Sequence, residues 1–193
     1  MTVRSGVKVG FTGAGGTGKT TTAVALAKEL GVQMMKSASR TAYEQLKITE
    51  ADCLKMDDKA KWELQGKIFG LKQTMDDNSF EFIADRTLLD HWAYCLMYCA
   101  PFISEPEFHQ FENNVRKHMK STYTHLFYFP WGYWTPETED GVRQVAPGWQ
   151  SAIDAIIVGY CVRWNLPAIQ VPQLNGPEFR QDFVKKHILG ENK

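Results

Sequence analysis

The sequence lacks a net charge, a long apolar run and a secretory leader, and each absence narrows the kind of protein it can be. Its 22 lysines and arginines balance 22 aspartates and glutamates, so the chain as a whole has no electrostatic attraction to nucleic acid or anionic membrane. No apolar run approaches the roughly 20 residues of a transmembrane helix, and the N-terminus lacks the apolar core of a signal peptide. We therefore expect a cytoplasmic protein with no membrane partner.

Cysteine is scarce, and the four cysteines, Cys53, Cys95, Cys99 and Cys161, form no C-x-x-C motif. His91, Cys95 and Cys99 are spaced four residues apart, which would place them on one face of a helix and raises the question of a zinc site. Their positions rise about 12 Å along the helix axis, too far for one tetrahedral ion. We interpret the cysteines as small buried side chains.

Glycine, threonine and one lysine are concentrated near the N-terminus. Residues 13–20 read GAGGTGKT, which fits G-x-x-x-x-G-K-[ST], the phosphate-binding loop called Walker A. Glycines let successive backbone N–H groups turn toward one anion, Lys19 would reach the β- and γ-phosphates, and the Thr20 hydroxyl would bind Mg²⁺. The nucleotide contacts that we expect are Gly13, Ala14, Gly15, Gly16, Thr17, Gly18, Lys19, Thr20 and Thr21.

The residues around this loop supply the context that it requires. Residues 7–12 are mostly apolar and predict a buried strand, while residues 20–30 favour a helix that ends before Gly31. With strand, lysine, hydroxyl and helix all present, a glycine-rich surface loop beside an unrelated helix is the weaker interpretation. We expect one domain, because 193 residues with 44 % hydrophobic content can fill a single α/β core.

Farther along the chain, helical and strand-like periods alternate without repeats. The patterns predict strands at 32–35, 80–84, 125–129 and 168–171, and helices near 64–75, 88–100, 104–119, 153–164 and 177–189. Residues 131–148 are aromatic and charged with no clean period, and the length of this segment suggests a functional loop. The predicted fold is an α/β P-loop fold over residues 1–193: a doubly wound parallel sheet of about five strands with helices on both faces and a lid at about 131–148.

The third predicted strand would deliver Asp85 and Arg86 at its carboxyl end, where ligands bind in open parallel sheets. Features of other P-loop proteins are missing. The D-x-x-G and N-K-x-D segments expected of a GTP switch do not occur, and Asp85 is followed by Arg86 where a motor ATPase would usually place a glutamate. These absences favour a kinase.

In three stretches the sequence resembles the small P-loop nucleoside and nucleotide kinases, particularly the branch with ribosylnicotinamide kinase domains and many phage-encoded kinases. The stretches are the loop at 13–20, DRTLLD at 85–90 and EDGVR at 139–143, and the likeness spans about residues 8–188. The resemblance implies phosphoryl transfer from ATP to a small nucleoside or nucleotide, with Mg²⁺ as cofactor.

The resemblance also implies roles for individual residues. Asp85 would lie beside Mg²⁺ and the acceptor, where it either holds a metal-bound water or takes the proton of an attacking hydroxyl. Alternatively, Asp85 has a structural role, either as a partner for Arg86 or as the cap of a helix. Arg40 and Arg86 would bind an acceptor phosphate, and Arg143 would close over the transferring phosphoryl group. The predicted catalytic residues are Lys19, Asp85, Arg86 and Arg143.

Ser37 and Trp134 bear on the acceptor. Related kinases often carry an acidic residue after the second strand, whereas this chain has Ser37 there. An acceptor that is already a phosphate needs arginines but no strong base, so we favour a nucleoside monophosphate over a nucleoside. Trp134 either stacks on the acceptor base or fills the core beneath the long loop.

Two alternatives stay open. Phage relatives include kinases that phosphorylate hydroxymethyluracil bases in DNA; neutral overall charge counts mildly against a DNA acceptor, while the basic cluster RKHMK at 116–120 leaves it open. A nucleotide-dependent binding module would instead use ATP to order residues 131–148 for a partner protein, without transferring a phosphoryl group.

Overall fold

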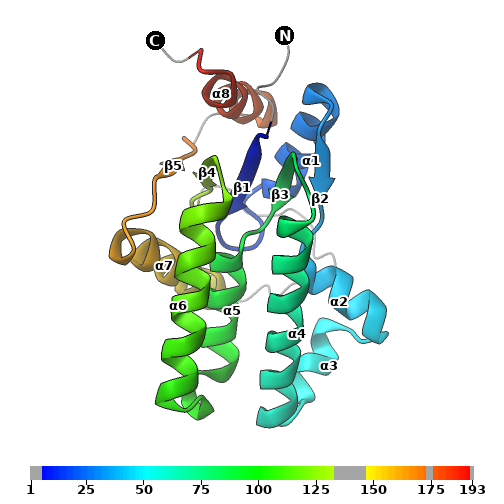
Figure 1. Ribbon diagram of the computed structural model, residues 1–193, viewed down its shortest axis with the longest axis vertical. Coiled ribbons are helices and arrows are strands. Elements are labelled where there is room, and N and C mark those ends of the chain that lie inside the picture. The colour runs from blue at the N-terminus through cyan, green and yellow to red at the C-terminus, as the bar shows by residue number, and fades with distance from the viewer. Residues whose placement is uncertain (1–5, 133–146, 173–175, 192–193) are drawn as a thin grey trace.

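The computed structural model describes residues 6–132, 147–172 and 176–191. Its centre is a five-stranded parallel sheet in the order β2-β3-β1-β4-β5 (Figure 1). Because β1 lies in the middle, with β2 and β3 on one side and β4 and β5 on the other, its carboxyl end is a topological switch point. The strands are β1 Lys8–Thr12, β2 Gln33–Met35, β3 Phe82–Asp85, β4 His125–Tyr128 and β5 Ala168–Gln170.

Helices cover both faces of the sheet, so the predicted fold class is confirmed. On one face, Val9 and Phe11 of β1 pack in a core with the buried residues of two helices, whereas Trp92 lies at the centre of the core on the other face. The period of two along each strand sends neighbouring side chains into different cores. The first face carries α1 Lys19–Leu30 and α8 Pro177–Leu189, and the second carries α4 Asp58–Asp77, α5 Leu88–Cys99, α6 Glu105–Thr122 and α7 Pro147–Arg163.

Two short helices between β2 and α4 were not predicted. They are α2 Ala38–Leu46 and α3 Glu50–Lys55, and α4 begins at Asp58, earlier than the apolar stripe from residue 64 indicates. Thr49 and Asp52 form a capping box at the start of α3, and Asp57 accepts a hydrogen bond from the backbone N–H of Ala60 at 2.8 Å. These start signals stand in the sequence, but the helices are too short for an apolar stripe to identify them.

The predicted start of α6 and end of α5 are confirmed. Ser104 and Glu107 form the expected capping box, and α5 ends at Cys99, before the 3-10 turn η1 Ala100–Phe102 that contains Pro101. The expected burial of the cysteines is confirmed for Cys53, Cys95 and Cys99, while Cys161 is half-buried.

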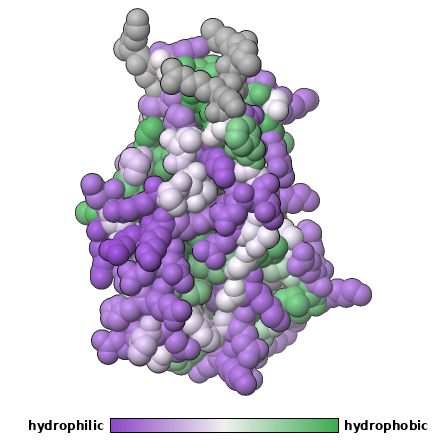
Figure 2. Space-filling model, in the orientation of Figure 1, coloured by the Kyte–Doolittle hydropathy of each residue, from purple (hydrophilic) through white to green (hydrophobic). Residues whose placement is uncertain are grey.

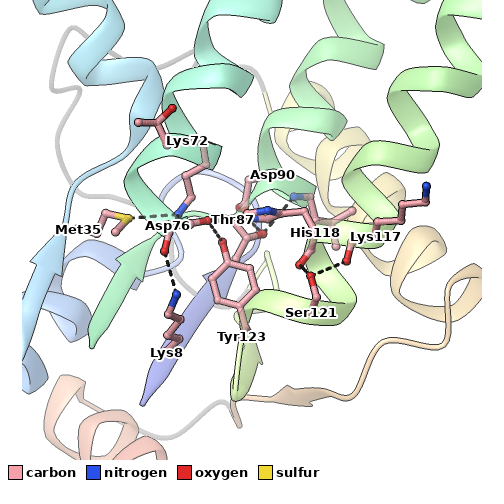
Figure 3. A network of polar contacts seen from close by, with 12 residues as sticks. Lys8, Met35, Lys72, Asp76, Thr87, Asp90, Lys117, His118, Ser121 and Tyr123 are labelled. Atoms are coloured by element: carbon pink, nitrogen blue, oxygen red, sulfur yellow. Dashed lines mark hydrogen bonds and ion pairs between the residues drawn. The ribbon is translucent and has the colours of Figure 1, made fainter. Parts of the chain in front are cut away.

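A charged pair lies entirely inside the protein (Figure 3). Lys72 and Asp76, one turn apart on α4, are both fully buried and form an ion pair. Asp76 Oδ2 also accepts a hydrogen bond from the Tyr123 hydroxyl at 2.8 Å and lies 2.9 Å from His118 Nε2. The Asp76 carbonyl accepts a further bond from Lys8 Nζ at 3.0 Å. The network joins α4, α6 and β1 at the edge of the core.

The helix expected near residues 64–75 continues to Asp77 and ends within the turn-like stretch 76–79, and the Asp76 side chain points into the protein. Burial would raise the pKa of Asp76, but the hydrogen bonds and charge supplied by His118, Lys72 and Tyr123 hold it below its usual value. Asp76 is thus a buried anion within a helix.

The surface on the side of α4 and α6 is predominantly hydrophilic (Figure 2). The basic cluster at 116–120 is divided between this surface and the interior. Arg116, Lys117 and Lys120 are exposed, while His118 and Met119 are buried. Within the described ranges, none of the helices is long and apolar enough to cross a bilayer.

Candidate active site

The loop between β1 and α1 closes around the side chain of Lys19, the first residue of α1. Lys19 Nζ donates hydrogen bonds to the Ala14 carbonyl at 2.6 Å and to Thr17 Oγ1 at 2.9 Å, and its side chain is buried. The predicted strand, loop and helix are confirmed. The positive end of α1 and the ammonium therefore converge on one place, where a phosphate would be stabilised.

Gly13 begins the loop in a conformation that excludes other residues. Its φ is +146°, and a Cβ at this position would lie 2.3 Å from the Phe129 carbonyl oxygen. The Gly13 N–H donates to Asp90 Oδ1 at 3.0 Å, while Asp90 Oδ2 accepts from the Thr87 N–H at 2.8 Å and the Thr87 hydroxyl at 2.9 Å. One carboxylate thus holds both the start of the loop and the first turn of α5.

Asp85 and Thr20 meet where β3 and α1 approach each other. The Thr20 hydroxyl donates to Asp85 Oδ2 at 2.6 Å, and Asp85 is the last residue of β3. A hydroxyl and a carboxylate at this spacing offer oxygen ligands of the kind that Mg²⁺ prefers, and phosphate oxygens and water would complete its octahedron. The two residues therefore fit Mg²⁺. The cap at the start of α5 is Thr87, so Asp85 does not serve as its N-cap.

Arg86 is held in an unusual position beside Asp85. Its φ is +88°, in the left-handed region. The guanidinium lies over the Tyr94 ring, 4.8 Å from the centroid, and Nη2 donates to the Tyr94 hydroxyl at 3.4 Å. Nη1 is buried and has no hydrogen-bond partner among the described residues. Burial would lower the pKa of Arg86, but Tyr94, Asp90 and Asp85 together raise it above its ordinary value, so the side chain stays a cation.

The remaining predicted site residues are either exposed or outside the described part of the chain. Arg40 is exposed in the first turn of α2, and Thr21 is exposed on α1. Arg143 and Trp134 lie outside the described residues, as does most of the expected lid at 131–148. The structure therefore brings together the loop, Asp85 and Arg86, and the roles of all the predicted residues stay predictions.

Sequence reasoning missed two polar residues on α7 that reach the site. Gln150 Oε1 accepts a hydrogen bond from the Gly15 N–H at 2.7 Å. Asp154, one turn later, accepts from the Tyr128 hydroxyl at 2.8 Å and the Trp131 N–H at 3.2 Å. Burial raises the pKa of Asp154 although these bonds and the Lys19 charge oppose the shift. No local pattern identifies such residues, because their partners are far away in the sequence.

Arg180 approaches the loop from α8. Its Nη1 donates to the Thr17 carbonyl at 3.2 Å. The contact places Arg180 against the phosphate-binding loop itself.

Buried His91 makes stability sensitive to acid. Its burial, together with the Arg86 and Lys72 charges and against the opposing effect of Asp76, lowers its pKa from 6.5 to about 3. The unfolded chain takes up this proton near pH 6.5 and the folded protein does not, so stability falls as pH decreases from 6.5 toward 3. We expect the wild type to lose about 2 kcal/mol more than His91→Leu between pH 7 and pH 5, measured by urea unfolding.

The control for this prediction is His109→Leu, because His109 is exposed on α6. This variant should lose as much stability as the wild type over the same interval. Equal losses in wild type and His91→Leu would show that His91 does not govern the pH dependence.

Comparisons with known proteins bear on the family and the fold of the chain. A family profile described as AAA domain, AAA_28, matches residues 8–178. A sequence search of curated proteins finds no significant match. The similarity to solved structures is one of fold, since the sequence identities below are all under 20 %.

Three solved structures with a similar fold are described as kinases or contain a bound nucleotide analogue. Deoxyadenosine kinase from M. mycoides, with dCMP and dCDP bound, has a TM-score of 0.69 at 12 % identity, covering 96 % of this chain and 100 % of its own. NadR with NAD and AMP-PNP has a TM-score of 0.70 at 13 % identity, covering 97 % of this chain and 51 % of its own. Shikimate kinase from Acinetobacter baumannii with shikimate has a TM-score of 0.61 at 13 % identity, covering 95 % and 93 %.

Proposed function

Since the chain belongs to the AAA domain family AAA_28, we propose that it is a cytoplasmic kinase that transfers a phosphoryl group from ATP to a small nucleoside or nucleotide, with a nucleoside monophosphate preferred. The observation that supports this most directly is the Thr20–Asp85 contact, which joins the phosphate-binding loop to the end of β3, where Arg86 follows. The glutamate that polarises water in motor ATPases is replaced by Arg86 in the sequence, which favours an acceptor other than water. The fold shared with NadR, which was solved with AMP-PNP bound, supports the binding of an adenine nucleotide.

On the nucleotide side, the loop and Lys19 hold the phosphates of ATP. Backbone N–H groups and the α1 N-terminus stabilise their negative charge, and the Lys19 ammonium reaches the β- and γ-phosphates. Thr20 and Asp85 would hold Mg²⁺, which neutralises charge on the phosphate oxygens when it is bound. Catalysis of this kind depends on positioning and charge rather than on a covalent intermediate.

On the acceptor side, Arg86 orients the attacking group. An acceptor oxygen attacks the γ-phosphorus while the bond to the β–γ bridging oxygen breaks, leaving ADP. If the acceptor is a phosphate, its oxygen is already ionised and no base is required. If it is a hydroxyl, Asp85 would serve as the base that takes the proton. Two features favour the phosphate: Nη1 of Arg86 has no hydrogen-bond partner within the described part of the chain, and buried Ser37 follows β2 where related kinases carry an acidic residue.

The test is transfer of label from γ-³²P-ATP with Mg²⁺ to nucleosides, nucleoside monophosphates, and modified and unmodified DNA. We expect label on a small nucleotide. We also expect Arg86→Lys to lower kcat/KM for a phosphorylated acceptor by about 10- to 100-fold, because lysine keeps the charge but cannot bind phosphate through two parallel bonds. Lysine and arginine are equally strained by the positive φ at this position, so the variant measures the effect of the guanidinium group alone.

Arg116→Lys on the exposed side of α6 is the matched control and should keep wild-type activity. An equally small effect of Arg86→Lys would remove Arg86 from the acceptor site. Label on DNA would favour the DNA kinase, and nucleotide binding without transfer to any acceptor would favour the binding module.

A further inference from the structure

The Arg86 side chain is held by an aromatic ring rather than by a carboxylate. Its guanidinium lies 4.8 Å from the centroid of the Tyr94 ring, and Nη2 donates to the Tyr94 hydroxyl at 3.4 Å. Within the described part of the chain, no aspartate or glutamate forms an ion pair with this guanidinium. Because 3.4 Å is long for a hydrogen bond, the attraction between the cation and the ring is the stronger contact.

The Tyr94 ring is itself supported by other aromatic side chains. Tyr94 and Tyr98 are one turn apart on α5, and their rings stack with centroids 6.4 Å apart and planes inclined by 26°. Tyr98 in turn packs against Trp149 of α7, with centroids 5.2 Å apart. The backbone of Arg86 is also held, since a φ of +88° persists only where the surrounding structure determines it. The guanidinium is therefore oriented before an acceptor binds.

Nη1 of Arg86 is the atom that this arrangement presents to an acceptor. It is buried and has no hydrogen-bond partner among the residues described. A buried N–H group without a partner is costly, and a phosphate oxygen would satisfy it with a charge-assisted bond. We propose that Tyr94 positions the Arg86 guanidinium for the acceptor phosphate and thereby determines the affinity for a phosphorylated acceptor. This proposal rests on the proposed function and adds a positioning residue to it.

The test is steady-state kinetics with the nucleoside monophosphate that accepts label. We expect Tyr94→Leu, which removes the ring, to raise KM for this acceptor by about 10- to 30-fold and to leave KM for ATP within about twofold. Tyr94→Phe keeps the ring and loses only the long hydrogen bond, so its KM should stay within about threefold of the wild type. Tyr94→Met repeats the removal of the ring if the leucine variant does not fold.

A double variant tests whether Tyr94 acts through Arg86. In the Arg86→Lys background, Tyr94→Leu should raise KM for the acceptor by less than about threefold, because the oriented guanidinium is already absent. The same increase in both backgrounds would overturn the proposal, since Tyr94 would then affect the site independently of Arg86.

Tyr160→Leu is the matched control. Tyr160 is half-buried like Tyr94, packs against Trp164, and has the Arg163 guanidinium 5.8 Å from its ring centroid. The variant removes the same kind of contact and should leave KM for the acceptor unchanged. An unchanged KM in Tyr94→Leu, or an equal rise in KM for ATP, would overturn the proposal. Absence of transfer to any nucleoside monophosphate by the wild type would instead overturn the proposed function, which separates the two failures.

Discussion

Lys19→Ala is expected to lower kcat for phosphoryl transfer by about 10³-fold, because it removes the side-chain cation that the loop encloses. Lys19 Nζ is bonded to Ala14 and Thr17 within the loop, so its charge is positioned before a nucleotide arrives. Preorganised charge is effective because little reorganisation is needed in the transition state. Steady-state kinetics with saturating ATP and Mg²⁺ measures the loss.

Lys28→Ala is the matched control for this variant, since Lys28 is exposed in the last turn of the same helix. It should keep wild-type turnover. Lys19→Ala with wild-type turnover would show that the phosphate site has been assigned wrongly. Circular dichroism of both variants establishes that any difference arises from the site rather than from unfolding.

Asp76→Ala is expected to lower the free energy of unfolding by about 3–5 kcal/mol, because it leaves the Lys72 ammonium buried without its anion. Both side chains are fully buried, and Asp76 also pairs with His118 and Tyr123. The depressed pKa of Asp76 means that its stabilising contribution is present above about pH 4 and is lost as pH falls through the folded-state value. Urea unfolding at pH 7 therefore measures the full effect.

The design includes two further variants. Asp77→Ala changes the neighbouring exposed aspartate and should alter stability by less than about 0.5 kcal/mol. The double variant Lys72→Met with Asp76→Ala removes both charges and should recover at least about half of the loss, since replacing a buried pair costs less than breaking it. A double variant as unstable as Asp76→Ala would mean that the hydrogen bonds to His118 and Tyr123, rather than the charge of Lys72, determine the cost.

Local patterns were sufficient to predict the elements that position the site. These elements are the Walker A loop, the apolar strand before it and the strand that ends at Asp85. Each depends on residues that are close together in the sequence, so a single sequence without homologues is enough to identify it. α2 and α3 were missed because they span nine and six residues, which is shorter than the stretch over which an apolar period can be recognised. The roles of Asp85 and Arg86 remain predictions that rest on position and resemblance.

Contacts made across the fold were not predictable from the sequence. Gln150 is 135 residues from its partner Gly15, and no spacing rule relates them. Tyr94 lies in an apolar stretch of α5, so the sequence does not predict that its hydroxyl and ring contact Arg86. Asp76 followed a helical pattern and preceded Asp77 and Asn78, which made it resemble a turn residue. In each case the tertiary structure, rather than local propensity, determines the partner.

The Asp90 carboxylate has a consequence for how the two substrates affect each other. One of its oxygens holds Gly13 of the nucleotide loop, and the other holds Thr87, the residue after Arg86. In the proposed reaction, nucleotide and acceptor would therefore bind on either side of a single anchor. Thermodynamic reciprocity then requires that if the nucleotide strengthens acceptor binding through this anchor, the acceptor strengthens nucleotide binding by the same factor. Natural variation at position 90 would thus alter both affinities at once.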